Sequence, residues 1–480
     1  MKGKNSKAGV TAIIILGVII LIALVPWVLI IAETISPSDS GEPTEEIIGN
    51  VTDEEDEPDE YLQDDDGSAL EEEPEPLPEP EFGPGYEIPL ENRIVEISVE
   101  HPELFSEMNE LSLRYNAVAV SVVAYDGETG EFFTYEYGYA DTHEGRLVDS
   151  GTKFRVASLT KLVTAICAMV LVDEGLLDLD ADVSIYLGYE VRNNNHPEDI
   201  ITTRMLLQHT SSVFDSGMYQ SARDRRAIET VRQLLENGSS FRRNQPGADF
   251  EYSNFGFSVI GAVIENIAGV SLDAYAREVL FDPLGIDAGY VPGNMRDTED
   301  IAVLYNDSHE IMRSIESQLD IEASHTPGQD LHLAHGNLTI SAIDYARILA
   351  MVGNGGILQS VRILSPDAVR QMHNADVTAH TYEQGLATRY SFGDFIHGKG
   401  FYWHSGSAYG AFTQYLYTLD NNTNRGIVVI TTGATTGREQ NGMISVCTSI
   451  CALVWRELRF TDHSAGQGGE SNQPEADEGV

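Results

Sequence analysis

Residues 8–32 form an uncharged, mostly apolar run of 25 residues near the N-terminus. A helix of that length can cross about 30 Å of hydrocarbon. Lys2, Lys4 and Lys7 precede the run and acidic residues follow it, so the positive-inside rule places a basic head, residues 1–7, in the cytoplasm and the rest outside. The run is longer than the about 7 to 15 apolar residues of a signal peptide, and no clear small-x-small cleavage site follows. We therefore predict an uncleaved single-pass anchor in the cell membrane; secretion after signal cleavage is the alternative.

A strongly acidic stretch without hydrophobic periodicity follows the anchor. Residues 33–81 contain 21 Asp or Glu and no Lys or Arg, and four prolines lie between residues 74 and 80. Such a segment cannot bury enough apolar surface to offset the entropy lost on ordering. We predict a disordered linker over residues 33–92 that tethers the following domain, and a disordered tail over residues 461–480.

Hydrophobic periodicity returns between these two segments and predicts one α+β domain over residues 93–460. A helix-like period covers residues 96–116. Two β-rich runs, residues 117–125 and 131–139, are separated by a short turn and predict a hairpin. The first part of the domain therefore supplies one helix and two strands.

The rest of the domain consists of a helix-rich middle, residues 158–374, and a second group of β-rich runs. The strands thus come from both ends of the domain, and the helices come from between them. We predict an antiparallel sheet flanked by terminal helices, plus a large all-helical lobe, with the cleft between them as the default site. The C-terminal elements that we expect are strands at 401–403, 412–419 and 426–432, a turn at Asn421-Asn422 and a helix over 437–456.

The charge composition restricts the possible partners. The 480 residues include 29 Lys or Arg and 76 Asp or Glu, which give a formal net charge of −47. Nucleic-acid binding needs a basic face, so we expect a small-molecule or peptide substrate and membrane contact only through the N-terminal helix. Three cysteines without a C-x-x-C motif form no disulfide framework, and we expect Cys447 and Cys451 to be core residues of one helix.

The strongest chemical signal is Ser158-Leu159-Thr160-Lys161, which opens an apolar run typical of a buried helix. Residues i and i+3 share a helix face, so Lys161 is placed beside the Ser158 hydroxyl. Burial lowers the pKa of a lysine, and a neutral amine is the proton acceptor that a serine nucleophile needs. After residue 81 the chain has 23 Arg but only three Lys, which favours a titratable amine over a lysine that merely extends to solvent. A second S-x-x-K, residues 150–153, lies in a turn-like stretch, and we assign it no role.

A second candidate segment is Tyr252-Ser253-Asn254, which follows a Pro-Gly turn and precedes an apolar helix. In an extended link, Tyr252 and Asn254 point to the same side. The phenol could then relay a proton to a leaving group, and the Asn254 amide could hold a substrate amide. Helix capping and packing are the alternative roles for this segment.

The third candidate segment is His404-Ser405-Gly406, which follows a strand-like run. A glycine permits close approach of another backbone. A strand edge next to a nucleophile can supply a backbone N–H to an oxyanion. The two donors would be the N–H groups of Ser158 and Ser407.

Together and in this order, the three segments resemble the motifs of the penicillin-recognising serine hydrolases, above all the branch with class C β-lactamases, D-Ala-D-Ala carboxypeptidases and related esterases. The resemblance covers about residues 95–458. The matching motifs are Ser158-x-x-Lys161, Tyr252-x-Asn254 and His404-x-Gly406, and the flanking segments 154–157, 206–211 and 337–346 also resemble family segments.

The resemblance implies a two-lobe β-lactamase/transpeptidase-like fold and an acyl-enzyme mechanism. Ser158 would attack a carbonyl, and Lys161 and Tyr252 would move protons. The third-motif segment would line the substrate site, with the Ser407 amide in the oxyanion hole, and Asn254 would bind the amide of the acyl side chain. No metal or organic cofactor is implied.

Two positions depart from the family pattern. His404 stands where the better-known β-lactamases and carboxypeptidases have Lys, so a permanent cation is replaced by one that titrates near pH 6.5. We therefore expect weak β-lactamase activity and poorer binding of carboxylate substrates above pH 7. Ser212 stands where the family usually has Gly, which suggests a differently shaped loop.

The sequence as a whole predicts a membrane-anchored extracytoplasmic serine hydrolase. Its expected substrates are cell-envelope D-amino-acid peptides or small amides and esters, with a carboxypeptidase or esterase favoured over a true β-lactamase. Two alternatives remain open. The first is a non-catalytic penicillin-binding-like sensor or scaffold, and the second is an acyltransferase that uses the same acyl-enzyme.

Overall fold

The computed structural model describes residues 93–458, apart from residues 225–229, 325, 380, 394–398, 421–422 and 438–440. The chain divides into two units, residues 1–75 and 76–480, and every described residue lies in the second. The predicted basic head, anchor, linker and tail (residues 1–7, 8–32, 33–92 and 461–480) and the predicted turn at Asn421-Asn422 lie outside the described residues.

The described part of the chain contains no single helix that is both long and apolar enough to cross a bilayer. One bent pair of helices, Asn254–Ala268 with Leu272–Phe281, passes the same test of length and composition.

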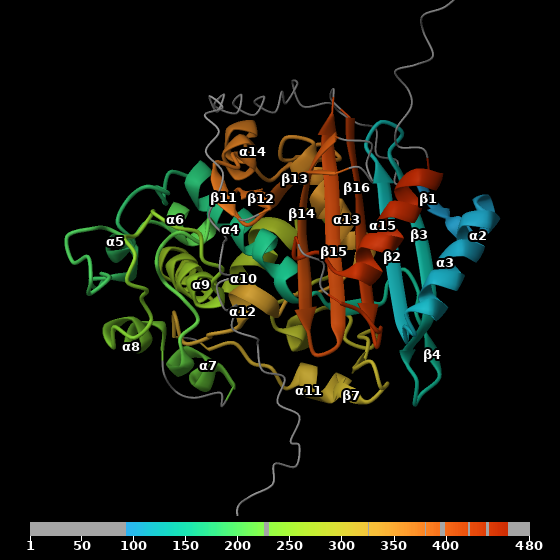
Figure 1. Ribbon diagram of the computed structural model, residues 1–480, viewed down its shortest axis with the longest axis horizontal. Helices are drawn as coiled ribbons and strands as arrows, with labels where there is room; N and C mark the ends of the chain where they lie inside the picture. Colours follow the sequence, from blue (N-terminus) through green and yellow to red (C-terminus); the bar gives the residue numbers. More distant parts are fainter. Residues whose placement is uncertain are drawn as a thin grey trace, which may run out of the picture. The chain divides into compact units, whose positions relative to one another are not determined.

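A ten-stranded mixed sheet forms one half of the domain (Figure 1). Its strand order is β1-β3-β2-β16-β15-β14-β13-β12-β11, with β4 paired to β3. The predicted hairpin of β2 and β3 is present, and β2 pairs with the last strand, β16, so both ends of the domain contribute to one sheet as predicted. The strands are β1 (Arg93–Glu96), β2 (Ala119–Asp126), β3 (Glu131–Asp141), β4 (Arg146–Leu147), β11 (Val377–Ala379), β12 (Tyr382–Gln384), β13 (Arg389–Gly393), β14 (Lys399–Ala408), β15 (Ala411–Asp420) and β16 (Thr423–Thr432).

The prediction of a wholly antiparallel sheet is wrong at one edge, because β1 runs parallel to β3. A strand of four residues is too short to be distinguished by periodicity from the first turn of the helix predicted over residues 96–116. That helix is also divided, into α2 (Ile97–Glu100) and α3 (Pro102–Arg114). Pro102 disfavours helical backbone at the residue before it, and His101 accordingly has φ −132° and ψ 63°.

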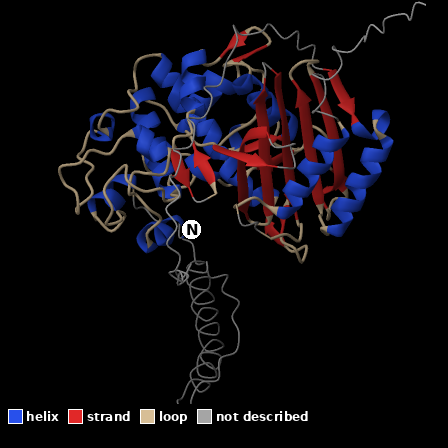
Figure 2. Ribbon diagram, turned by 45° about the horizontal axis from the view of Figure 1, so that its top comes forward, coloured by secondary structure: helices blue, strands red, loops and turns tan. Residues whose placement is uncertain are grey.

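Helices cover both faces of the sheet (Figure 2). The terminal helices α3 and α15 (Ser445–Glu457) pack on one face, and α13 (Ala342–Gly353) packs on the other. Alternate residues of a strand point to opposite faces, so Val122 of β2 enters the core beneath α3 and α15 while Val123 enters the core on the α13 side. Because both faces are covered, β2 is buried along its whole length and is apolar apart from Ser121 and Asp126. Cys447 and Cys451 of α15 are free and buried, as predicted.

The segment between β4 and β11 is rich in helices but is not all-helical as predicted, because it holds three two-stranded sheets. Strands of two or three residues are too short to show a period that could predict them. The strands are β5 (Lys153–Arg155) with β8 (Thr339–Ser341), β6 (Leu304–Tyr305) with β7 (Ile311–Arg313), and β9 (Ile357–Leu358) with β10 (Val361–Arg362). The helices are α4 (Thr160–Asp173), α5 (Val183–Leu187), α6 (Thr203–Leu207), α7 (Gly217–Asp224), α8 (Val231–Glu236), α9 (Asn254–Ala268), α10 (Leu272–Ala276), α11 (Ile315–Leu319), α12 (Leu333–Gly336) and α14 (Pro366–His373), with the short turns η1 (Ala157–Leu159), η2 (Arg277–Phe281) and η3 (Pro292–Asn294).

Candidate active site

Ser158 lies in η1, a single 3-10 turn that leads directly into α4. The residue before it, Ala157, has φ +48°, a left-handed conformation that is energetically costly for a residue with a side chain. The following helix is buried from Thr160 to Leu171, as its apolar run predicted. A strained turn on a core helix therefore presents the Ser158 hydroxyl.

Lys161 is fully buried and touches Ser158. Its Nζ lies 3.2 Å from Ser158 Oγ, 2.8 Å from Asn254 Oδ1 and 3.1 Å from the backbone oxygen of His335. Burial lowers the pKa of the Lys161 amine, and the neighbouring Tyr252 and Asp215 oppose that effect only in part. The arrangement therefore moves Lys161 toward the neutral form that can accept a proton from Ser158.

The second S-x-x-K segment has a different environment. Lys153 of β5 lies 3.5 Å from an Asp287 oxygen and 3.4 Å from an Asp297 oxygen. It is thus an ion-paired cation, in contrast to Lys161.

Tyr252 and Asn254 both reach the Ser158–Lys161 pair, as their predicted common direction requires. The Tyr252 hydroxyl donates to Ser158 Oγ at 3.0 Å, and Asn254 accepts from Lys161. The capping role belongs to the residue between them, since Ser253 caps α9 and accepts from the backbone N–H of Gly256.

Asp215 fixes this segment, and the sequence analysis did not single it out. Its carboxylate accepts from Asn254 Nδ2 at 2.8 Å, from the Phe255 backbone N–H at 2.8 Å and from Ser253 Oγ at 3.3 Å. The ring of His209 lies 4.5 Å from the ring of Tyr252, centroid to centroid. Asp215 lies about 40 residues before its partners and carries no recognisable spacing, so only the tertiary structure reveals it.

Strand β14 passes beside η1, and Gly406 makes the approach possible. A Cβ atom at Gly406 would lie 2.8 Å from the Val156 backbone oxygen and 2.9 Å from the Ser158 backbone nitrogen, closer than real Cβ contacts. β13 pairs with β14 only as far as Trp403. Within the described chain, the next five residues of β14, His404–Ala408, pair with β15 alone, which leaves a free strand edge next to Ser158.

Ser407 is placed to donate from that edge. A two-residue turn joins β14 to β15, with Tyr409 and Gly410 at φ +53° and +77°. In such hairpins the residues that flank the turn, here Ala408 and Ala411, are hydrogen-bonded to each other. Along an antiparallel ladder, hydrogen-bonded pairs alternate with pairs whose N–H groups point away from the partner strand. The Ser407 N–H therefore points away from β15, toward the free edge of β14. The side chain of Ser405 has a partner of its own, because its hydroxyl donates to the backbone oxygen of Gly442.

The prediction that His404 titrates near pH 6.5 is wrong. The side chain is buried, and its Nδ1 lies 2.7 Å from the Ser405 backbone oxygen, which can only accept. Burial, together with the nearby cations Arg389 and Lys161, lowers the pKa of His404 well below its usual range. The imidazole is therefore neutral at pH 7. The burial of the side chain sets this pKa, and burial cannot be read from the sequence.

Arg389 is a cation that the sequence analysis missed. It opens β13 opposite Trp403 of β14, is 8% exposed, and stacks among three aromatic rings. Its Cζ lies 4.6 Å from the ring centroid of Tyr382, 4.9 Å from that of Trp403 and 5.6 Å from that of Tyr252. Its Nε is buried and has no hydrogen-bond partner among the described residues, and the guanidinium stands next to Tyr252.

The loop at Ser212 keeps a glycine-like conformation. Ser212 has φ +61°, and its hydroxyl accepts a hydrogen bond from Asn193 Nδ2 at 2.9 Å. The serine thus replaces glycine in a left-handed position and gains a side-chain bond there.

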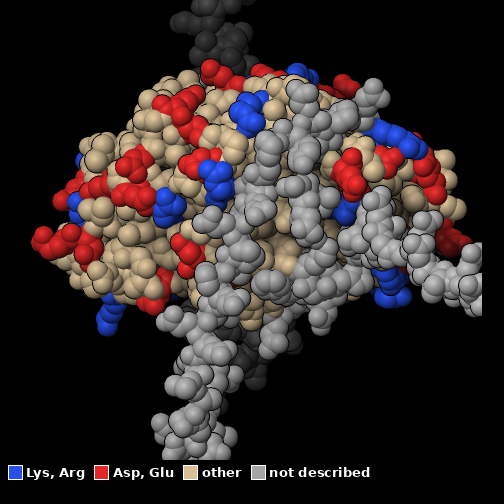
Figure 3. All heavy atoms as spheres, turned by 90° about the horizontal axis from the view of Figure 1, so that it is seen from above, with Lys and Arg blue, Asp and Glu red and all other residues tan. Residues whose placement is uncertain are grey.

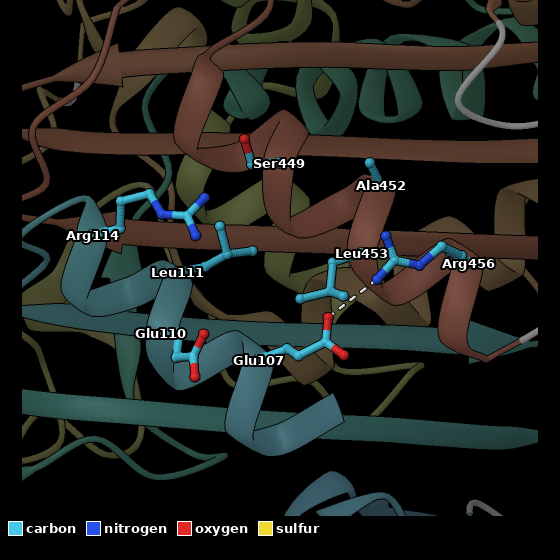
Figure 4. Close-up of a pocket in the computed structure, with 8 residues that line it drawn as sticks. All are labelled: Glu107, Glu110, Leu111, Arg114, Ser449, Ala452, Leu453 and Arg456. Atoms are coloured by element: carbon cyan, nitrogen blue, oxygen red, sulfur yellow. Dashed lines mark hydrogen bonds and ion pairs between the residues drawn. The ribbon is translucent and has the colours of Figure 1, made fainter. Parts of the chain in front are cut away.

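A hollow of about 330 Å³ lies away from these residues, between α3 and α15 (Figure 4). Its lining includes Glu107 and Arg456, which point toward each other and form an ion pair at 3.1 Å. The face seen in Figure 3 carries acidic side chains interspersed with Lys and Arg. The lining of the hollow includes none of the residues around Ser158, so we place the candidate site at the strained serine turn.

Comparison with known proteins gives a consistent family. The family model described as Beta-lactamase matches residues 104–444, which include all three motifs. Esterase EstB of Burkholderia gladioli is 33% identical over 202 residues, which are 39% of this chain and 50% of the esterase. The chain therefore spans about half the length of this curated relative.

Solved structures show the same fold at low identity. A structure described as a beta-lactamase/D-alanine carboxypeptidase from Pseudomonas syringae has a TM-score of 0.59 and 18% identity, and the match covers 75% of this chain and 99% of that one. A D-stereospecific amidohydrolase from Streptomyces has a TM-score of 0.52 and 21% identity, with 69% and 95% covered. These likenesses support the predicted α+β architecture.

Proposed function

Because the chain belongs to the beta-lactamase family of serine hydrolases, we propose that it hydrolyses its substrate through an acyl-enzyme on Ser158. One observation carries the proposal. The Ser158 hydroxyl contacts both a buried lysine amine, at 3.2 Å, and a tyrosine hydroxyl, at 3.0 Å. A nucleophile held by two proton carriers is the arrangement that acyl transfer requires.

The reaction follows from these contacts. Ser158 Oγ attacks the substrate carbonyl while its proton passes to the neutral Lys161 amine. The Ser158 and Ser407 N–H groups bind the resulting oxyanion. Tyr252 gives its proton to the leaving group and recovers one from Lys161, which leaves the acyl-enzyme. A water then attacks the acyl carbonyl and gives its proton to the Lys161 amine. Tyr252 gives its proton to Ser158 Oγ and recovers one from Lys161, which releases the acid and frees Ser158.

The proposed substrates carry a carboxylate near the leaving group. Arg389 supports this, because a buried guanidinium without a carboxylate partner in the described chain is suited to a bidentate substrate carboxylate. The neutral His404 cannot serve as that cation. The fold likeness to a D-alanine carboxypeptidase and to a D-stereospecific amidohydrolase favours amides of D-amino acids, and the likeness to an esterase favours small esters as a second class.

The proposed location is the outer face of the cell membrane. The uncharged run of residues 8–32, preceded by three lysines, supports an N-terminal anchor with the catalytic domain outside. Envelope peptides are the substrates within reach of such an enzyme. The acidic segment of residues 33–81 would act as the tether.

A fluorophosphonate probe tests the proposal on the full-length protein in detergent. Intact mass should show one adduct that is lost in Ser158→Ala and kept in Ser150→Ala, the matched control from the second S-x-x-K segment. Failure of the folded wild-type protein to label would favour the non-catalytic binding module. Product analysis with an added amine acceptor separates hydrolysis from acyl transfer.

A further inference from the structure

A second group of arginines lies at the other end of the free edge of β14, around Tyr409. The Arg155 Cζ lies 4.7 Å from the Tyr409 ring centroid, and the Arg313 Cζ lies 4.0 Å from it. The phenol ring is thus held between two guanidiniums. Tyr409 is 37% exposed and occupies a left-handed position in the β14–β15 turn.

These two guanidiniums have no carboxylate partner in the described chain, although the sequence contains 76 acidic residues. Arg155 is 7% exposed, and its Nε donates to the Gly336 backbone oxygen at 2.7 Å. Burial and the like charge of Arg313 lower the pKa of Arg155 to about 10. A buried cation that is not neutralised is costly to folding, so its retention here indicates a ligand of opposite charge.

The pKa of Tyr409 is also affected by these positive charges. Burial would raise the pKa of its phenol, but Arg155, Arg313 and Arg223 lower the pKa on balance. A nearby positive charge stabilises a phenolate just as it stabilises a carboxylate. Three cations from β5, β7 and α7 therefore act on one point of the surface.

The position of this group relative to the nucleophile indicates its use. Arg155 precedes Ser158 by three residues, and Tyr409 follows Ser407 by two. Arg389 marks the opposite end of the edge, next to Tyr252, where the leaving group departs. The edge between Trp403 and Tyr409 is about 20 Å long at the usual rise of a strand. The Tyr409 end therefore adjoins the acyl part of a substrate that lies along β14.

We infer that Arg155, Arg313 and Tyr409 form a subsite for a carboxylate on the acyl part of the substrate. The inference rests on the proposed function and narrows it to substrates with acidic groups on both sides of the scissile bond. The guanidiniums bind the carboxylate through charged hydrogen bonds, and the neutral phenol donates one more. The free edge of β14 holds the extended chain between the two acidic groups.

Two esters of equal acyl length test the subsite. The p-nitrophenyl monoester of adipic acid carries a terminal carboxylate, and p-nitrophenyl hexanoate lacks it. We expect the wild-type protein to favour the adipate ester in kcat/KM, and Arg313→Gln to lower that preference about tenfold. Arg296→Gln is the matched control, because it removes an exposed arginine that pairs with Asp282 and Asp287, and it should keep the preference. An unchanged preference in Arg313→Gln, or an equal loss in Arg296→Gln, would overturn the inference.

A binding measurement separates this inference from the proposed catalysis. Calorimetry on Ser158→Ala with adipic acid monoamide needs no turnover. Binding that Arg313→Gln weakens about tenfold and Arg296→Gln does not would support the subsite even in a protein that no probe labels. Absence of binding to a folded protein would refute it. Thermal unfolding of each variant checks that it is folded.

The phenol supplies a further readout. As the pH rises through the lowered pKa of Tyr409, its phenolate neutralises Arg155 and Arg313, so the preference for the adipate ester should fall at alkaline pH. Tyr409→Phe removes this titration, and its preference should stay constant over the alkaline range below the pKa of about 10 of Arg155. A parallel decline in both proteins would show that the phenol does not share the subsite.

Discussion

Replacement of Gly406 by alanine should impair catalysis strongly in a protein that still folds. The added Cβ would lie 2.8 Å from the Val156 oxygen and 2.9 Å from the Ser158 nitrogen, and it would also meet Thr413 Oγ1. Carbon contacts are comfortable at about 3.5 Å, so β14 must move away from η1 by about 0.7 Å. Overpacking of this kind costs about 1–3 kcal/mol of stability.

The same displacement separates the two proposed oxyanion donors, the Ser158 N–H on η1 and the Ser407 N–H on β14. Such donors act at about 2.7–3.1 Å, and loss of one costs about 10²–10³ in kcat. We therefore expect Gly406→Ala to lower kcat by about 10²-fold with a small change in KM. Gly437→Ala is the matched control, because a Cβ there meets nothing within 4 Å.

The assay is steady-state hydrolysis of p-nitrophenyl hexanoate, with fluorophosphonate labelling as a second measure of Ser158 reactivity. Thermal unfolding gives the stability of the same preparations. A folded Gly406→Ala protein with kcat within threefold of the wild type would refute the placement of the oxyanion hole between η1 and β14.

Three further substitutions test the groups around the nucleophile. Lys161→Arg should lower kcat by about 10²–10⁴-fold, because a guanidinium stays protonated near pH 7 and cannot accept the Ser158 proton; the wild-type rate should rise with pH through the lowered Lys161 pKa, and a flat pH profile would contradict this role. Asp215→Asn should lower kcat about tenfold by releasing Asn254, and unchanged kcat and KM would show that Asp215 is not a positioning residue. His404→Asn tests stability: the native pKa of His404 lies below that of the unfolded chain, so its contribution is complete above about pH 6.5 and is lost, at up to about 1.4 kcal/mol per pH unit, as the pH falls. Urea unfolding at several pH values between 7 and 5 gives the free energy of unfolding as a function of pH. This free energy should fall less steeply with decreasing pH in His404→Asn than in the wild type, and an equal fall in both proteins would contradict the burial of His404.

Local chemistry explains why the main elements could be predicted. The Ser158 helix is apolar on all sides, so it had to be buried, and burial of Lys161 followed from its position in the first turns. The β2–β3 hairpin and the strands β15 and β16 had clear β-rich runs between turns. The motif residues Ser158, Lys161 and Tyr252 were found because three short patterns occurred in a fixed order, and the structure brings them into contact.

Short elements and long-range contacts could not be predicted in this way. β1 has four residues, and the paired strands β5 and β8 have three each, too few for a period to appear. Asp215 contacts the Tyr252 segment although it lies about 40 residues earlier in the sequence. Arg389 approaches the Tyr252 ring from strand β13. Neither residue belongs to a pattern, since an isolated Asp or Arg has the same local signature on a surface and in a site.

The sequence by itself identified the candidate nucleophile, its candidate amine partner and the family, because spacing along one helix turn is a local property. Only the tertiary structure decided the charge of the site. It buries His404 beside other cations and so keeps it neutral, and it places Arg389 at one end of the β14 edge and Arg155 with Arg313 at the other. A side chain's ionisation depends on its burial and on charges from distant segments, and the fold alone sets both.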